Sequence, residues 1–292
     1  MNNIVRYRAG LILACLCLVF LSLTATTANA AAKKNVTLVY VEWDCATASS
    51  YLAKAAMEER LGVSVELLPV SAADMWASVA TGDADGFVTA WLPVTHASYA
   101  EKLRGQYEDL GPLVSGARLG WAVPEYVTVT SMSDVGKHAK EFRNTITGID
   151  AGAGIMELSE KAMKRYGLDG MVLQDGSGAT MAAALGDAVR RKEWIVVTAW
   201  SPHWMFGRWQ LRYLDDPEKT LGGSESIHTI ARTGLKKDKP EVYAFLDNFH
   251  YENIDQLQTL MSWNQEKGAD LTANAKKFMQ EHPGLVDSWF GK

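Results

Sequence analysis

One phrase occurs twice in this chain and constrains its fold more than any other feature. Residues 89–96 read TAWLPVTH, and 109 residues later residues 198–204 read TAWSPHW. Each copy follows a short apolar run that predicts a buried strand, so each places a tryptophan, Trp91 or Trp200, and a strand-breaking proline at a strand end. The duplication predicts two similar halves that offer aromatic rings to one cleft.

The order of predicted elements is the same around both copies. Strands are expected at residues 36–41, 63–70 and 87–89, and again at 146–150, 171–174 and 194–198. The helices between them are expected at residues 51–61, 75–81, 156–166 and 179–191. This repeated βαβαβ order predicts an α/β protein with a largely parallel sheet and helices on its faces. Ligands of such folds bind beyond the carboxyl ends of the strands, where both tryptophans fall.

Two further segments connect the halves. Residues 119–124 form an apolar run that ends at a proline, and residues 226–233 alternate like a returning strand. The stretch 240–289 has helical spacing and is expected to pack back on the first half. We therefore expect a first lobe of residues 31–122 and 234–292, a second lobe of residues 123–233, and a hinge where the chain crosses between them.

The first 30 residues predict an export signal. Arg6 and Arg8 give a basic end, residues 11–23 are apolar, and residues 28–30 read ANA, which is typical of a cleavage site. The apolar run is shorter than the roughly 18 residues that a spanning helix needs. We expect cleavage near Ala30 and a soluble, exported mature chain.

The net charge narrows the class of ligand, and the cysteine count bears on disulfide bonds. The net charge of −5 becomes −7 once Arg6 and Arg8 are removed, so nucleic acid and anionic lipid are poor candidates. Cys45 is alone in the expected mature chain, which excludes a disulfide within it. We expect this thiol to be buried and inert.

Three tryptophans at predicted strand ends, Trp43, Trp91 and Trp200, suit a bulky cation without hydrogen-bond donors. A quaternary ammonium group is attracted by the negative faces of aromatic rings, with up to ~2 kcal/mol for each desolvated contact. Three contacts give roughly 6 kcal/mol, short of the ~8 kcal/mol of micromolar affinity, so a second anchor is needed.

The turn at residues 152–155, which opens a predicted helix, supplies that anchor. Free backbone N–H groups and the helix dipole bind anions there, and glycine lets the anion approach closely. His96, five residues after Trp91, can donate a further hydrogen bond. Because charge-assisted hydrogen bonds contribute about 1.5–3 kcal/mol each, a ligand with both a quaternary ammonium and a carboxylate fits the two anchors.

Simpler interpretations stand beside these. A tryptophan at a strand end can be a packing residue, a Gly-x-Gly turn can be a tight connection, and His96 can be a surface or capping histidine. Asp44 is a helix N-cap, a polar brace for the cleft or a contact to a cation. Trp204 and Trp209 line the rim or cover the second lobe, and three tryptophans are expected in the core: Trp121, Trp194 and Trp289.

The chain resembles the substrate-binding proteins of ABC importers for glycine betaine and related osmoprotectants (OpuAC/ProX-like). The matching segments are residues 40–44, 90–96, 148–156, 199–206 and 213–217. The resemblance implies a type II periplasmic binding protein fold with a ligand cleft between two hinged lobes. It implies that Trp43, Trp91 and Trp200 box the trimethylammonium group. It further implies that the backbone N–H groups of Gly154 and Ile155, with the His96 side chain, bind the carboxylate.

We therefore expect a periplasmic receptor, a monomer without cofactor or metal, that binds glycine betaine and delivers it to an ABC permease. Choline, carnitine or dimethylsulfoniopropionate in the same box are alternatives. A ligand sensor with the same pocket is another. An exported enzyme is disfavoured, because the chain has neither an H-E-x-x-H motif nor a G-x-S-x-G elbow.

Overall fold

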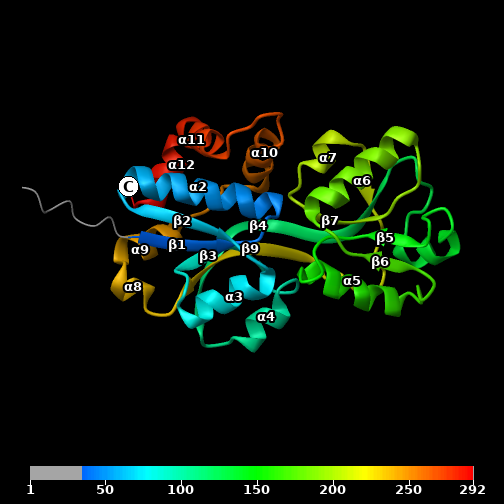
Figure 1. The fold of residues 1–292 in the computed structure, drawn as a ribbon, viewed down its shortest axis with the longest axis horizontal. Coiled ribbons are helices and arrows are strands. Elements are labelled where there is room, and N and C mark those ends of the chain that lie inside the picture. Colours follow the sequence, from blue (N-terminus) through cyan, green and yellow to red (C-terminus); the bar gives the residue numbers. More distant parts are fainter. Residues whose placement is uncertain (1–34, 292) are drawn as a thin grey trace, which may run out of the picture. The chain divides into compact units, whose positions relative to one another are not determined.

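The computed structural model describes residues 35–291 (Figure 1). The predicted signal peptide of residues 1–30 lies outside the described residues. Within residues 35–291, no helix combines the length and the apolar character that crossing a bilayer requires.

The strands form one mixed sheet. Its order is β2-β1-β3-β9-β4-β7-β5-β6, with β8 also paired to β4. The strands are β1 Asn35–Tyr40, β2 Ser64–Pro69, β3 Gly86–Leu92, β4 Tyr107–Pro124, β5 Thr145–Thr147, β6 Val172–Gln174, β7 Val197–Ser201, β8 Leu211–Tyr213 and β9 Ser224–Arg232.

The helices gather around the two ends of this sheet (Figure 1). Around β1–β3 lie α2 Asp44–Arg60, α3 Ala72–Thr81, α4 Ala97–Lys102, α8 Leu235–Asp238, α9 Pro240–Asn248, α10 Ile254–Asn264, α11 Leu271–Glu281 and α12 Pro283–Trp289. Around β5–β7 lie α5 Gly154–Arg165, α6 Gly178–Arg191 and α7 Met205–Arg208, and a 3-10 helix, η1, spans Met132–His138. We call the first set with β1–β3 the first half, and β5–β7 with α5–α7 and their connecting loops the second half.

The predicted parallel sheet is correct within each half and wrong at the centre. The pairs β1·β3, β5·β6 and β5·β7 are parallel. By contrast, β4 runs antiparallel to β7 and β9, and β9 runs antiparallel to β3. The reason is connectivity: β4 leaves the first half and β9 returns to it, so the two strands pass each other in opposite directions and pair. The expected crossing segment 119–124 lies within β4, and the segment 226–233 lies within β9 except for its last residue.

Helix α2 begins earlier than expected. It starts at Asp44, directly after Trp43, whereas the apolar pattern predicted residues 51–61. Its first two turns are small side chains, including Cys45, Ala46, Ala48 and Ser49, and all four are buried. Tertiary packing, rather than a local pattern, therefore sets this start. The C-terminal helices α10 and α11 pack on α2.

The aromatic core follows the prediction in two of three positions. Trp121 and Trp289 are fully buried, and their indole N–H groups donate to Ser159 Oγ at 2.9 Å and to the His250 carbonyl at 2.8 Å. Trp194 is only partly buried, because it lies in the loop before β7 and packs beside His138 near the surface. The expectation of a core position for Trp194 is therefore wrong.

One buried carboxylate ties the strands of the first half to the helices that follow β9. Asp85 is 5% exposed and accepts hydrogen bonds from Thr37 N at 2.9 Å, Arg232 Nε at 3.0 Å and Lys239 Nζ at 2.6 Å. The bonds connect the turn before β3 with β1, the end of β9 and the start of α9. A side chain with this many charged partners is expected to matter for stability.

We expect Asp85→Ala to lower the free energy of unfolding by about 3 kcal/mol, because it breaks the bonds from Thr37 N, Arg232 and Lys239 together, although Arg232 keeps its ion pair with Asp238. Asp187→Ala is the control, since the Asp187 side chain is about half exposed and forms a surface ion pair with Arg190. It should cost below about 1 kcal/mol. Urea unfolding of both variants measures the difference, and equal losses would contradict the role of Asp85.

Candidate ligand-binding site

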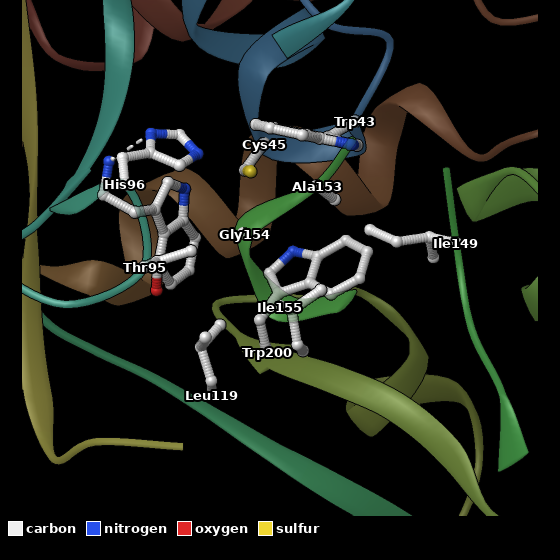
Figure 2. Close-up of a pocket in the computed structure, with 11 residues that line it drawn as sticks. Trp43, Cys45, Thr95, His96, Leu119, Ile149, Ala153, Gly154, Ile155 and Trp200 are labelled. Carbon is white, nitrogen blue, oxygen red and sulfur yellow. Dashed lines mark hydrogen bonds between the residues drawn. The ribbon is translucent and has the colours of Figure 1, made fainter. Parts of the chain in front are cut away.

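A pocket lies where the two halves meet, at the carboxyl ends of β3 and β7 (Figure 2). All six residues that the sequence singled out for binding line it. The full lining is Trp43, Cys45, Trp91, Thr95, His96, Leu119, Ile149, Ala153, Gly154, Ile155 and Trp200.

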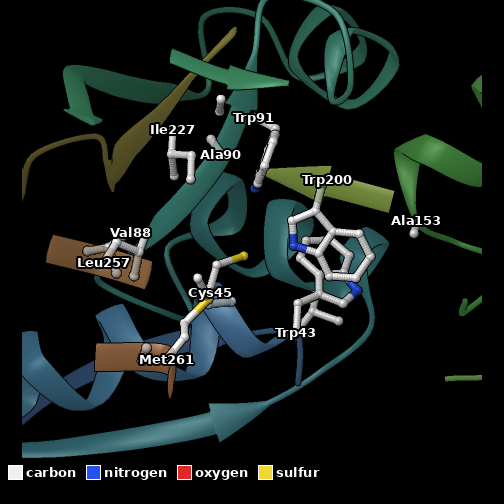
Figure 3. Packing of buried hydrophobic residues seen from close by; sticks show 14 of the residues in the cluster. Trp43, Cys45, Val88, Ala90, Trp91, Ala153, Trp200, Ile227, Leu257 and Met261 are labelled. Carbon is white, nitrogen blue, oxygen red and sulfur yellow. The ribbon is translucent and has the colours of Figure 1, made fainter. Parts of the chain in front are cut away.

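Three indole rings from three different elements form the apolar walls. Trp91 lies in β3 opposite Ile227 of β9, and Trp200 lies in β7 opposite Leu119 of β4. The strands thus run through both tryptophans rather than stopping before them, and the sheet holds both rings in place. Trp43 precedes α2, and all three rings are less than a tenth exposed. Figure 3 shows them gathered around one space with the Cys45 sulfur.

His96 presents one N–H group to this space. The ring is fully buried, and its Nδ1 accepts a hydrogen bond from Trp91 N at 3.1 Å, so the proton of the neutral ring sits on Nε2. Burial lowers the pKa of His96 to about 3, which keeps the ring neutral. Nε2 has no hydrogen-bond partner among the described residues. In Figure 2 it is the ring nitrogen on the pocket side.

The amino end of α5 supplies further donors. The helix starts at Gly154, two residues earlier than expected, with Ala153 in extended conformation before it. Gly154 N and Ile155 N find no acceptor among residues 35–291, as expected for the first turn of a helix, and both residues line the pocket. The positive end of the helix dipole points the same way, so this corner favours an anion.

The two halves touch closely at Gly154. A Cβ atom built there would lie 2.0 Å from the Thr95 carbonyl oxygen, a contact that backbone cannot relieve without moving. The loop that carries Thr95 is held in turn by Glu225, which is 2% exposed. Its Oε1 accepts from Val94 N and Thr95 N at 2.8 Å each, and its other oxygen accepts from the Thr95 hydroxyl. Only glycine fits at position 154 while these halves remain in contact.

The comparisons with known proteins agree with this geometry. A family model for the substrate binding domain of ABC-type glycine betaine transport systems matches residues 34–281. The chain belongs to this family. The glycine betaine/carnitine transport binding protein GbuC of Listeria monocytogenes is 45% identical over 152 residues, which are 51% of this chain and 50% of that protein. The chain thus matches about half the length of this curated relative.

Two solved structures are similar over most of the chain. Lactococcal OpuAC, in a closed conformation complexed with glycine betaine, has a TM-score of 0.84 and 40% identity, covering 88% of this chain and 100% of that one. A glycine betaine/L-proline-binding protein from Borrelia burgdorferi has a TM-score of 0.85 and 35% identity, covering 88% and 97%. The fold is that of a type II periplasmic binding protein, as the resemblance implied.

The pocket lining carries no ionised side chain. It contains no Asp, Glu, Lys or Arg, and His96 is neutral. Burial raises the pKa of the Cys45 thiol to about 12, so Cys45 is also neutral, and it is buried as expected. Within residues 35–291 no three His, Cys, Asp or Glu side chains are grouped to hold a metal ion. A pocket of this kind suits a ligand whose own charges cancel.

Asp44 acts as a polar brace and not as a helix cap. Trp43 occupies the N-cap position of α2, while the Asp44 carboxylate accepts from Trp204 Nε1 at 2.9 Å and from Gln265 Nε2 at 2.7 Å. Trp204 and Trp209 pack against each other with ring centres 5.5 Å apart. Neither lines the pocket itself. Both line a neighbouring hollow together with Asp44 and Gln265 of the first half, so they lie at the rim between the halves.

Sequence reasoning did not assign four residues to the site. Thr95 and Leu119 line the pocket, and Glu225 and Asp150 hold lining residues by hydrogen bonds. The two carboxylates gave no signal, because a carboxylate on a strand or in a loop looks like any exposed polar residue.

The neutral state of His96 predicts a pH effect on stability. An unfolded histidine has a pKa near the ordinary value of 6.5, whereas burial holds the folded value near 3. The unfolded state therefore takes up a proton that the folded state excludes. The contribution of His96 to the free energy of unfolding is therefore fully present above pH 6.5. It falls by about 1.4 kcal/mol per pH unit as the pH is lowered from 6.5 toward 3.

His96→Gln should remove this dependence. In urea unfolding of the unliganded protein, the stability gap between wild type and variant should narrow by about 1.4 kcal/mol per pH unit below about pH 6.5. A gap that stays constant with pH would show that His96 takes up a proton in the folded state.

Proposed function

We propose that this protein is a periplasmic solute-binding receptor that captures glycine betaine and delivers it to the permease of an ABC importer. The observation that carries the proposal is one uncharged pocket whose lining combines three indole rings with three N–H donors, Gly154 N, Ile155 N and His96 Nε2, that have no partner among the described residues. The family to which the chain belongs and the names of its relatives support the same ligand class.

Trp43, Trp91 and Trp200 are assigned to the trimethylammonium group. The group has no hydrogen-bond donor, so its attraction comes from the ring faces, with about 2 kcal/mol available at each desolvated contact. The rings are buried and held by the sheet or by α2, so little side-chain entropy is lost on binding.

Gly154 N, Ile155 N and His96 Nε2 are assigned to the carboxylate. All three donors lack a partner within residues 35–291, which is costly for buried groups unless a ligand pairs them. Hydrogen bonds to a charged acceptor contribute about 1.5–3 kcal/mol each, so these donors and the rings together reach micromolar affinity after the costs of association.

The pocket favours a zwitterion over choline. Choline carries a net positive charge and a hydroxyl, so it would leave the helix end without an anion and place an uncompensated charge among neutral side chains. Glycine betaine brings its own counter-charge. Carnitine and dimethylsulfoniopropionate share this property and are the closest competitors.

We infer that the protein binds its ligand without converting it. Of the polar side chains in the lining, Cys45 is a neutral thiol, the Thr95 hydroxyl donates to Glu225, and His96 Nδ1 is occupied by Trp91 N. No nucleophile is therefore paired with a free base in the pocket.

The lobe division proposed for this function places residues 31–122 and 234–292 in one lobe and residues 123–233 in the other. The crossing strands β4 and β9 are the only sheet connection between the two ends of the described sheet, and they are the natural hinge. The predicted signal peptide supports a periplasmic location, and delivery to a permease requires only a monomer.

Titration calorimetry of the purified protein tests the proposal. Glycine betaine should bind with about micromolar affinity and choline about a hundredfold more weakly, with proline betaine, carnitine and dimethylsulfoniopropionate completing the panel. Trp200→Ala should weaken glycine betaine at least about tenfold, since it removes one ring face. Failure of every onium compound to bind would refute the proposal. An unchanged affinity of Trp200→Ala for glycine betaine would refute the assignment of Trp200 to the trimethylammonium group.

Gly154→Ala should weaken glycine betaine binding by about tenfold to a hundredfold, because the added methyl meets the Thr95 backbone and overpacking of this kind costs ~1–3 kcal/mol. Gly178→Ala is the matched control. Gly178 also opens a helix, α6, but a Cβ atom there meets nothing within 4 Å. Equal affinities of the two variants in the same titration would show that the halves need not approach as closely as they do here.

A further inference from the structure

Two hydrogen bonds from indole N–H groups to carboxylates cross between the halves in opposite directions. Trp43 Nε1 of the first half donates to Asp150 Oδ1 of the second at 2.8 Å. Trp204 Nε1 of the second half donates to Asp44 Oδ2 of the first at 2.9 Å. Neither carboxylate lines the pocket, but one of the two indoles, Trp43, does.

Asp150 is fixed to the same corner as the anion-binding helix end. It lies between Ile149, which lines the pocket, and the turn into α5, and its carbonyl oxygen accepts from Ala153 N at 2.9 Å. Among the described residues the hydrogen-bond partner of its carboxylate is Trp43 Nε1. Its negative charge is therefore available to the indole that it contacts.

The bond to Asp150 has an electrostatic consequence for Trp43. A charged acceptor draws the N–H proton toward itself and leaves more electron density on the ring, which makes the ring face more negative. The attraction of that face for a cation then increases, since it depends on the ring's charge distribution. A ligand head group of the same shape without a charge would not bind more tightly for this reason.

We propose that Asp150 is a positioning residue that acts through Trp43: across the cleft it orients this wall of the aromatic box and makes the box selective for a positively charged head group. The inference rests on the proposed function, because it assumes that Trp43 faces the onium group. It adds a residue outside the pocket to the determinants of ligand charge.

The hydrogen bond between Asp44 and Trp204 serves as the comparison for the bond between Asp150 and Trp43. It forms the same kind of bond across the same cleft, but to Trp204, which does not line the pocket. It also contacts Gln265 Nε2 at 2.7 Å and lies 3.2 Å from His203 Nε2. Loss of the Asp44 charge should affect how firmly the halves hold together and should not distinguish charged from neutral ligands.

The test compares glycine betaine with 3,3-dimethylbutanoate, which has the same shape but carbon in place of the charged nitrogen. The readout is the ratio of the two dissociation constants from titration calorimetry. Asp150→Asn keeps a hydrogen-bond acceptor and removes the charge. It should weaken glycine betaine about fivefold and should not weaken the analogue, whose head group carries no charge, so the preference for glycine betaine falls about fivefold.

Asp44→Asn is the control and should leave the ratio unchanged. Trp43→Phe removes the indole N–H, so adding Asp150→Asn to that variant should cause no further change in the ratio. An unchanged ratio in Asp150→Asn, an equal change in Asp44→Asn, or a full effect of Asp150→Asn in the Trp43→Phe background would each overturn the inference. Failure of wild type to bind glycine betaine would instead refute the proposed function.

Discussion

The antiparallel pairing of β4 with β9 is the constraint on which the rest of the structure depends. These strands carry the chain from the first half to the second and back, and they join the two ends of the sheet. Through β3 and β7 they also place Trp91 and Trp200 on facing sides of one pocket. A slip of one residue between β3 and β9 would turn Trp91 to the opposite face of the sheet, and a slip between β7 and β4 would do the same to Trp200.

The charged side chains nearest the pocket lie behind its lining and not in it. The lining is neutral, whereas Asp150 and Glu225 lie behind it and accept hydrogen bonds from the lining residues Trp43 and Thr95. Asp44 accepts from Trp204 beside the pocket. A zwitterion can bring two opposite charges into such a pocket without a protein counter-ion. The carboxylates hold neighbouring residues in place, and their desolvation is offset by N–H and O–H donors.

Much of the fold and all six proposed binding residues could be predicted because their signals are local. A strand, a tryptophan and a proline recur in the same order, and the Gly152–Gly154 turn opens a helix. The start of α2 could not be predicted, since its small residues show no apolar period. Trp194 was misplaced in the core because apolar character alone does not report how close a loop lies to the surface.

The sequence by itself determined the duplicated halves, the aromatic residues at their strand ends and the anion-favouring helix start, because each follows from side-chain order over a few residues. Only the tertiary structure decided the strand directions at the centre of the sheet, the glycine contact at Thr95 and the partners of the carboxylates. Trp43 and Asp150 are 107 residues apart in the chain, and Asp44 and Trp204 are 160 apart. Contacts at such separations depend on how whole elements pack, which no local pattern encodes.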